Sequence, residues 1–173
     1  MVRETMRVSR SEYDDPGPVR ITERSEYLVS RINLSRQHPE VYEQLAAFSA
    51  AAEEAAAAAE LSPNLIELIK LRVSQLNGCA FCCRLHTRDA RAAGETADRL
   101  SVLPAWWESQ YFSALEQAAL GLAEEVTRLS VPERTDWDTD ELTPAQVSAV
   151  SWLAVVMNAW NRVAIRSGYR VAP

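Results

Sequence analysis

Signals that begin helices recur along this chain of 173 residues and restrict its fold more than any other feature. In a capping box, a Ser or Thr and a Glu or Gln three residues later satisfy free amides at a helix start, and such boxes begin at Ser113 and at Thr143. Proline at the first helical position recurs at residues 39, 63 and 144. No segment alternates convincingly between apolar and polar residues as a strand would. The sequence therefore predicts an all-α protein.

The same signals predict where the helices run. We expect long helices over residues 39–59, 63–77, 79–93, 113–129 and 144–168, and a short segment over 97–103 that leads to Pro104. The last helix is apolar on more than one side, which is typical of a helix at the centre of a bundle or at a subunit interface. Its main apolar stripe is predicted to contain Trp152, Val156, Trp160 and Ile165.

The first 24 residues differ from the rest of the chain. They are charged, they contain the turn-rich run Asp14-Asp15-Pro16-Gly17-Pro18, and they show no helical periodicity. We therefore predict an N-terminal arm over residues 1–24 and a single helical domain over residues 25–173, with an acidic loop over 132–141. A chain of this length buries a core without disulfides or structural metals.

The net charge limits the classes of partner that we expect. The chain has 18 Lys and Arg against 24 Asp and Glu, a formal charge of −6, which gives no net attraction to nucleic acid or to an acidic membrane surface. No apolar run approaches the roughly 20 residues that span a bilayer, and the first residues lack the apolar core of a signal peptide. These features predict a cytoplasmic protein with no nucleic-acid or membrane partner.

All three cysteines and one of the two histidines lie within residues 78–86. On a helix, the spacing of three from Cys79 to Cys82 and of four from Cys82 to His86 places these side chains on one face. The break at Asn77-Gly78 puts both thiols at a helix start, where the positive end of the dipole favours the thiolate. Cysteines this close do not form a secreted disulfide framework. The cluster therefore indicates redox chemistry or metal binding.

The stretch from Glu67 to His86 resembles the AhpD-like alkylhydroperoxidase core of the carboxymuconolactone decarboxylase family. The family motif places a Glu twelve residues before the first Cys of a CxxC pair and a His four residues after the second, and Glu67, Cys79, Cys82 and His86 fit each step. The likeness extends over residues 25–170. The best-studied branch has a second His directly before the second Cys, where this chain has Phe81.

The resemblance implies an all-helical fold, assembly into homo-oligomers and a thiol peroxidase cycle that needs no metal or organic cofactor. In that cycle Cys82 attacks a hydroperoxide and becomes a sulfenic acid, Cys79 condenses with it to a disulfide, and a dithiol reductant restores both thiols. Glu67 and His86 would form the proton relay that deprotonates Cys82 and protonates the leaving alkoxide.

Two other functions stay open at this point. One is a metal-binding module that uses Cys79, Cys82 and His86, with Cys83 as a further ligand; because zinc sites usually draw on two separated pairs of ligands, another subunit would have to complete it. The other is a helical oligomer that acts as a scaffold and carries unreactive thiols. Unlike the peroxidase members of the family, the lactone decarboxylases typically lack the paired cysteines, so the pair argues against that activity.

Several residues also have simple structural interpretations. Glu67 is spaced to form a surface ion pair with Lys70. Cys83 is interpreted as a packing residue, and His38 as a loop residue before a helix-starting proline. The pair Trp106-Trp107 is interpreted as part of the apolar core.

Overall fold

The computed structural model describes residues 32–129 and 139–172, and within these ranges the chain forms helices and no strand. The prediction of an all-α fold is confirmed. The predicted arm over residues 1–24 and most of the predicted acidic loop lie outside the described residues. The helices follow one another as α1 (Leu34–Gln37), α2 (Pro39–Ala58), α3 (Pro63–Leu76), α4 (Ala80–Ala92), α5 (Ala97–Val102), η2 (Leu103–Glu108), α6 (Ala114–Arg128), η3 (Thr139–Glu141) and α7 (Pro144–Ser167).

The polar residues predicted to begin helices do so in the structure. The side chain of Ser62 accepts a hydrogen bond from a backbone amide in the first turn of α3. Ser113 and Thr143 form complete capping boxes at the starts of α6 and α7, with Glu116 and Gln146 as their partners. These local contacts fix the helix starts without help from distant parts of the chain.

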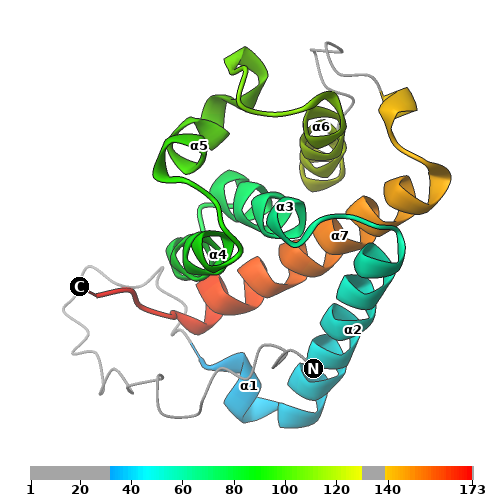
Figure 1. Cartoon of the computed structure of the whole chain (residues 1–173). Coiled ribbons are helices and arrows are strands. Elements are labelled where there is room, and N and C mark those ends of the chain that lie inside the picture. Colours follow the sequence, from blue (N-terminus) through cyan, green and yellow to red (C-terminus); the bar gives the residue numbers. More distant parts are fainter. Residues whose placement is uncertain (1–31, 130–138, 173) are drawn as a thin grey trace.

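Helix α3 lies at the centre of the bundle, with α4, α6 and α7 packed around it (Figure 1). Its residues Leu68, Ile69 and Val73 are fully buried. The main core lies between α2, α3, α6 and α7, and a second apolar cluster joins α3 to η2 and α6 through Leu68, Leu71, Leu103, Trp106, Phe112 and Leu120. The site described below is built from the polar residues of this central helix and of its neighbours.

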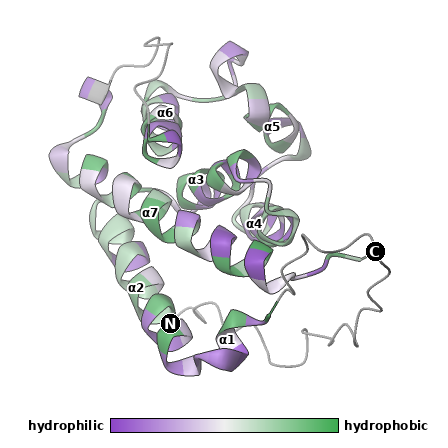
Figure 2. Cartoon of the chain, turned by 180° about the vertical axis from the view of Figure 1, so that it is seen from behind, coloured by the Kyte–Doolittle hydropathy of each residue, from purple (hydrophilic) through white to green (hydrophobic). Residues whose placement is uncertain are grey.

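The predicted apolar stripe on α7 is only half buried. Val156 and Trp160 are buried, but Trp152 and Ile165 are 48% and 42% exposed. At about 100° per residue, Trp152 and Ile165 lie at opposite edges of the wide face that α7 buries against α2, α3 and α6, so they do not continue one stripe. Figure 2 shows strongly hydrophilic residues among the hydrophobic ones in the C-terminal half of α7. Within the described ranges, none of the helices is long and apolar enough to cross a membrane.

Candidate redox site

A tight turn joins α3 to α4 and places both cysteines of the CxxC pair. Gly78 adopts a left-handed conformation with φ of 67°, which favours glycine. Cys79 then caps α4, and its sulfur accepts a hydrogen bond from the backbone amide of Cys82, with 3.3 Å between the two atoms. The sequence predicted a helix beginning at Cys79, and the helix begins one residue later with Cys79 as its cap. Both sulfur atoms therefore lie at the positive end of the α4 dipole.

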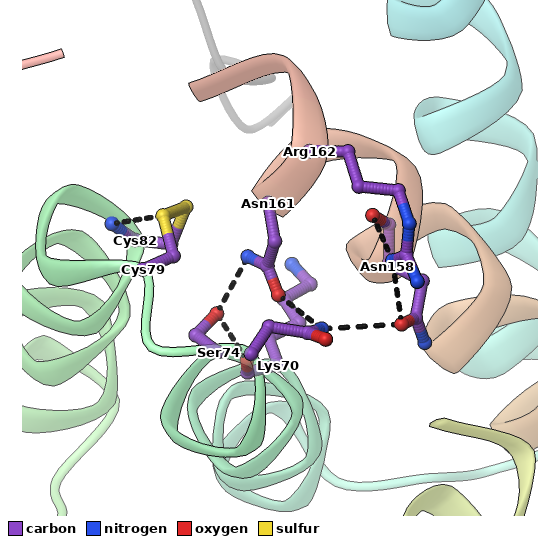
Figure 3. The surroundings of a disulfide bond; sticks show 8 residues. Lys70, Ser74, Cys79, Cys82, Asn158, Asn161 and Arg162 are labelled. Carbon is purple, nitrogen blue, oxygen red and sulfur yellow. Dashed lines mark hydrogen bonds between the residues drawn. A yellow bond between two sulfur atoms is a disulfide. The ribbon is translucent and has the colours of Figure 1, made fainter. Parts of the chain in front are cut away.

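Cys79 and Cys82 form a disulfide, with their Cα atoms 5.3 Å apart (Figure 3). The two residues are only 1% and 4% exposed. Phe81 and Tyr169 pack beside them, with ring centroids 5.2 Å apart in an edge-to-face arrangement. Cys79 and Cys82, which are expected to cycle between dithiol and disulfide, are thus at bonding distance. They lie at the start of α4, beside a residue that follows α7.

A buried imidazole follows this pair on α4 and is paired with a carboxylate on α3. His86 follows Cys82 by one turn of α4, and its Nδ1 is 3.0 Å from Oε2 of Glu67 on α3. The other ring nitrogen, Nε2, is buried and has no hydrogen-bond partner among the described residues. An ionised carboxylate only accepts hydrogen bonds, so Nδ1 is the donor in this contact, and Nε2 of the neutral ring is the unprotonated nitrogen. This nitrogen is available to take a proton.

Lys70 extends the cluster of charged groups to a third helix. Its Nζ donates to Oε1 of Glu67 at 2.9 Å and to Oε1 of Glu53 on α2 at 2.6 Å. Burial by itself raises the pKa of Glu67, but the hydrogen bond from His86 and the charge of Lys70 outweigh it, so the pKa of Glu67 is lowered. Burial likewise disfavours the charge of Lys70, yet the two carboxylates raise its pKa. Both groups are therefore charged at neutral pH.

Asp89 is the remaining acidic group near His86. Its carboxylate oxygen is 4.0 Å from Nδ1 of His86, and burial together with the charge of Glu67 raises its pKa. One donor atom from each of Glu67, His86 and Asp89 lies within 4.8 Å of the others. The ammonium of Lys70 already neutralises Glu67, which disfavours a metal ion there. The cysteine-based metal set considered from the sequence does not converge in the described structure, because the disulfide occupies both sulfurs of the CxxC pair.

A cluster of amides supports the turn that carries Cys79. Nδ2 of Asn77 donates to Oδ1 of Asn161 at 2.8 Å and to Oδ1 of Asn158 at 3.1 Å. Asn161 is fully buried, and its Nδ2 donates to the hydroxyl of Ser74 at 3.1 Å (Figure 3). These bonds tie the end of α3 to α7. No role was predicted for Asn158 or Asn161 from the sequence.

Cys83 points away from the redox pair. It is a free thiol that packs against the second apolar cluster, the one that contains Trp106, and burial raises its pKa. Its environment agrees with the interpretation of Cys83 as a packing residue.

Trp106 is buried as expected, and its indole nitrogen donates to Glu124. His38 is exposed between α1 and α2, as predicted for a loop residue.

Two charged residues of the site were missed from the sequence. Lys70 was considered only as a surface partner of Glu67, although it is 6% exposed, and Glu53 was not considered. A lysine within the apolar stretch from Leu65 to Val73 was the signal that could have identified a buried cation. Glu53 lies 17 residues earlier on another helix, so only the packing of α2 on α3 brings it close.

Comparison with known proteins identifies the family. The sequence profile of the Carboxymuconolactone decarboxylase family matches residues 39–125, about half of the chain. The chain belongs to this family. The matched region contains Glu67, Cys79, Cys82 and His86. This result confirms the resemblance on which the sequence-based hypothesis rested.

Two known proteins are similar to this chain. The uncharacterized protein YdfG of Bacillus subtilis (strain 168) is 41% identical over an alignment of 117 residues, and the match covers 61% of this chain and 75% of YdfG. The crystal structure of ATU0492 from Agrobacterium tumefaciens, a protein of unknown function suggested to be the antioxidant defence protein AhpD, superposes with a TM-score of 0.67 at 26% identity. That match covers 83% of this chain and 99% of ATU0492. The fold is therefore the AhpD-like fold.

Proposed function

We propose that this member of the carboxymuconolactone decarboxylase family is a thiol peroxidase that reduces hydroperoxides through Cys79 and Cys82. One observation carries the proposal: a CxxC pair at disulfide distance lies one helical turn from a buried imidazole. Its Nδ1 is held by Glu67, and its Nε2 has no hydrogen-bond partner among the residues that the structure describes. A reactive thiol needs a nearby base, and the base needs a group that orients it. The site contains all three.

The cycle begins with the reduced pair. Nε2 of His86 takes the proton of the Cys82 thiol, and the thiolate attacks one oxygen of the hydroperoxide. The O–O bond breaks, Cys82 becomes a sulfenic acid, and the leaving alkoxide receives the proton from His86 to form an alcohol. The Cys79 thiol then condenses with the sulfenic acid, which forms the disulfide and releases water. A dithiol reductant closes the cycle by thiol–disulfide exchange and is itself oxidised to a disulfide.

The assignment of roles follows the positions of the two cysteines. Cys82 lies on the same helix as His86 and one turn before it, whereas Cys79 precedes the helix as its cap. Cys82 is therefore the residue that the imidazole activates, and Cys79 resolves the sulfenic acid. Because the cycle consumes dithiols, we place it in a reducing compartment such as the cytoplasm.

We further propose that the protein assembles into homo-oligomers. Phe48 on α2 and Trp152 on α7 pack edge to face with centroids 5.6 Å apart, and both are partly exposed in the isolated chain, as is Val155 on α7. Exposed aromatic and aliphatic residues grouped on adjacent helices are typical of a subunit interface. Analytical ultracentrifugation of the wild type and of Trp152→Glu tests this: the wild type is expected to be oligomeric and the variant to dissociate. A monomeric wild type at micromolar concentration would contradict it.

The peroxidase proposal is tested by turnover. Reduced wild-type protein, supplied with an organic hydroperoxide and a dithiol such as dihydrolipoamide or dithiothreitol, is expected to consume peroxide continuously. Cys82→Ser is expected to reduce consumption to the rate without protein, because serine does not attack peroxide at neutral pH. Cys79→Ser is expected to react once and then stop as a sulfenic acid, which a dimedone label detects by mass spectrometry.

Cys83→Ser is the matched control, since it removes a neighbouring thiol that lies outside the pair. Its turnover is expected to equal that of the wild type. If the wild type is inert with several hydroperoxides and dithiols while Cys79 and Cys82 resist both oxidation and reduction, the protein is a helical scaffold and the proposal is wrong.

A further inference from the structure

Lys70 lies at the middle of a chain of charged groups that reaches the redox pair. The chain runs from Glu53 on α2 through Lys70 and Glu67 on α3 to His86 on α4, with separations of 2.6, 2.9 and 3.0 Å. Lys70 is almost fully buried and touches neither the disulfide nor His86 in any described contact. The described hydrogen bonds of Lys70 therefore connect it to His86 only through Glu67.

We propose that Lys70 is a positioning residue whose charge keeps Glu67 ionised and thereby keeps Nε2 of His86 free of a proton. Its significance for catalysis rests on the function proposed above. Lys70 lies outside the Glu67–His86 relay, yet under this proposal its charge controls which atoms of the relay are protonated.

Burial of the Glu67 carboxylate has an energetic cost. Its side chain is 15% exposed, and burial favours the neutral form of a carboxyl group. Asp89, which has a carboxylate oxygen within 4.8 Å of one of Glu67, adds a like charge that disfavours ionisation further. The ammonium 2.9 Å from Oε1 offsets both effects. With Oε1 occupied by Lys70, Oε2 is the oxygen left to accept from Nδ1 of His86.

Removal of this cation raises the affinity of the Glu67–His86 pair for one more proton. The added proton has two positions. On Glu67 it creates a hydroxyl that donates to Nδ1, so the ring changes tautomer and Nε2 gains the hydrogen. On the ring it produces an imidazolium, in which both nitrogens carry hydrogens. In both cases Nε2 is protonated and no longer accepts a proton from a thiol.

Glu53 has a different role in this scheme. It accepts from Lys70 but makes no described contact with His86, and it adds a second negative charge beside the ammonium. Neutralising Glu53 leaves the charge of Lys70 fully available to Glu67. The charge model therefore predicts that loss of Glu53 and loss of Lys70 act on His86 in opposite directions, although either change disturbs the packing between α2 and α3.

The test is the protonation state of His86 in the oxidised protein, measured by long-range ¹H–¹⁵N NMR at neutral pH. The oxidised form is used because the disulfide cannot exchange a proton with the ring. The chain has only two histidines, and exposed His38 serves as the internal reference, assigned with His38→Asn. In the wild type, Nε2 of His86 is expected to resonate as an unprotonated ring nitrogen. In Lys70→Met it is expected to move to the range of a protonated one, while His38 is unchanged.

Four further variants make the test specific. Lys70→Gln, which keeps hydrogen-bond donors but removes the charge, is expected to match Lys70→Met and replaces it if the methionine variant does not fold. Lys70→Arg is expected to keep Nε2 unprotonated because the charge is retained. Glu53→Gln is expected to keep it unprotonated as well. Arg72→Met is the matched control, since it removes a buried cation of the same helix that pairs with Glu124 instead of Glu67.

A folded neutral variant of Lys70 that keeps Nε2 unprotonated would overturn the proposal. So would protonated Nε2 in the wild type, in Lys70→Arg or in Arg72→Met, because the effect would then not follow the charge beside Glu67. No peroxide enters this experiment. A protein that failed the turnover assay and passed this one would leave the role of Lys70 standing and refute only the peroxidase function.

Discussion

Lys70 and Arg72 are buried cations two residues apart on α3, and they belong to two different clusters of charged groups. Arg72 donates to Oε1 of Glu124 at 2.6 Å, and the indole of Trp106 donates to the same oxygen at 2.9 Å. Arg128 binds the other oxygen, Oε2, at 2.9 Å. Each oxygen of Glu124 is thus paired with at least one donor among the described residues. The cluster of Lys70, in contrast, ends at Nε2 of His86, which has no hydrogen-bond partner in the described part of the chain.

The cluster of Arg72 therefore has the features of a structural ion pair, and the cluster of Lys70 has those of a reactive site. A fully satisfied buried pair fixes neighbouring elements in place, and breaking it by removal of one partner is strongly destabilising. A buried polar atom without a hydrogen-bond partner lowers the stability of the fold, so its presence needs an explanation other than stability. Such atoms are frequent at functional sites. In this protein the unsatisfied atom belongs to His86, one helical turn after a cysteine of the disulfide. The redox chemistry proposed above therefore belongs to the cluster of Lys70, and the cluster of Arg72 is expected to contribute to stability.

The largest effect is expected from His86→Gln. Loss of a positioned general base and acid typically costs about 10²- to 10⁴-fold, so the rate constant for reaction of reduced protein with hydroperoxide should fall by a factor in that range. The unfolding free energy should change far less. Stopped-flow tryptophan fluorescence measures the rate, and urea unfolding measures the stability. A variant as fast as the wild type would remove the chemical distinction between the two clusters.

Glu124→Gln is expected to have the converse effect. It leaves the buried guanidinium of Arg72 without a counter-charge, so the unfolding free energy should fall by about 3–5 kcal/mol. The rate of the folded variant with peroxide should be unchanged, because Glu124 makes no described contact with Glu67 or His86. Urea unfolding and the same stopped-flow assay measure both quantities. Folded Glu124→Gln that lost as much rate as His86→Gln would show that the clusters are not separate.

A smaller effect is expected on the way the unfolding free energy depends on pH in the acid range. The pKa of Glu67 in the folded protein is lowered from its ordinary value of 4.5, so the unfolded chain binds the proton more readily. The stabilisation from ionised Glu67 is complete above that ordinary value and is lost as pH falls through the lower pKa of the folded state. The difference in unfolding free energy between the wild type and Glu67→Gln should therefore shrink as the pH is lowered below 4.5. A difference that stays constant or grows would contradict this sign.

The sequence predicted local features well and long-range contacts poorly. The capping boxes at Ser113 and Thr143 depend on residues three apart, so the starts of α6 and α7 were predicted correctly. The pairing of Glu67 with His86 came from motif spacing, and the structure brings them together.

Contacts that arise only from packing were missing from the prediction. The pairs Glu53–Lys70 and Arg72–Glu124 join residues of different helices, and no periodicity within one helix reveals them. The exposure of Trp152 was also missed, because the extent of the buried face of α7 depends on how many helices surround it.

The central claim is that Cys79 and Cys82, with His86 as their base, reduce peroxide. A single-turnover titration tests it most directly. Fully reduced protein is mixed with increasing amounts of an organic hydroperoxide in the absence of reductant, and peroxide consumed, alcohol formed and disulfide formed are quantified, the last by peptide mapping. The account predicts one alcohol and one Cys79–Cys82 disulfide for each peroxide consumed, at a rate far above that of free cysteine. Thiols that stay reduced, or that react no faster than free cysteine, would contradict it.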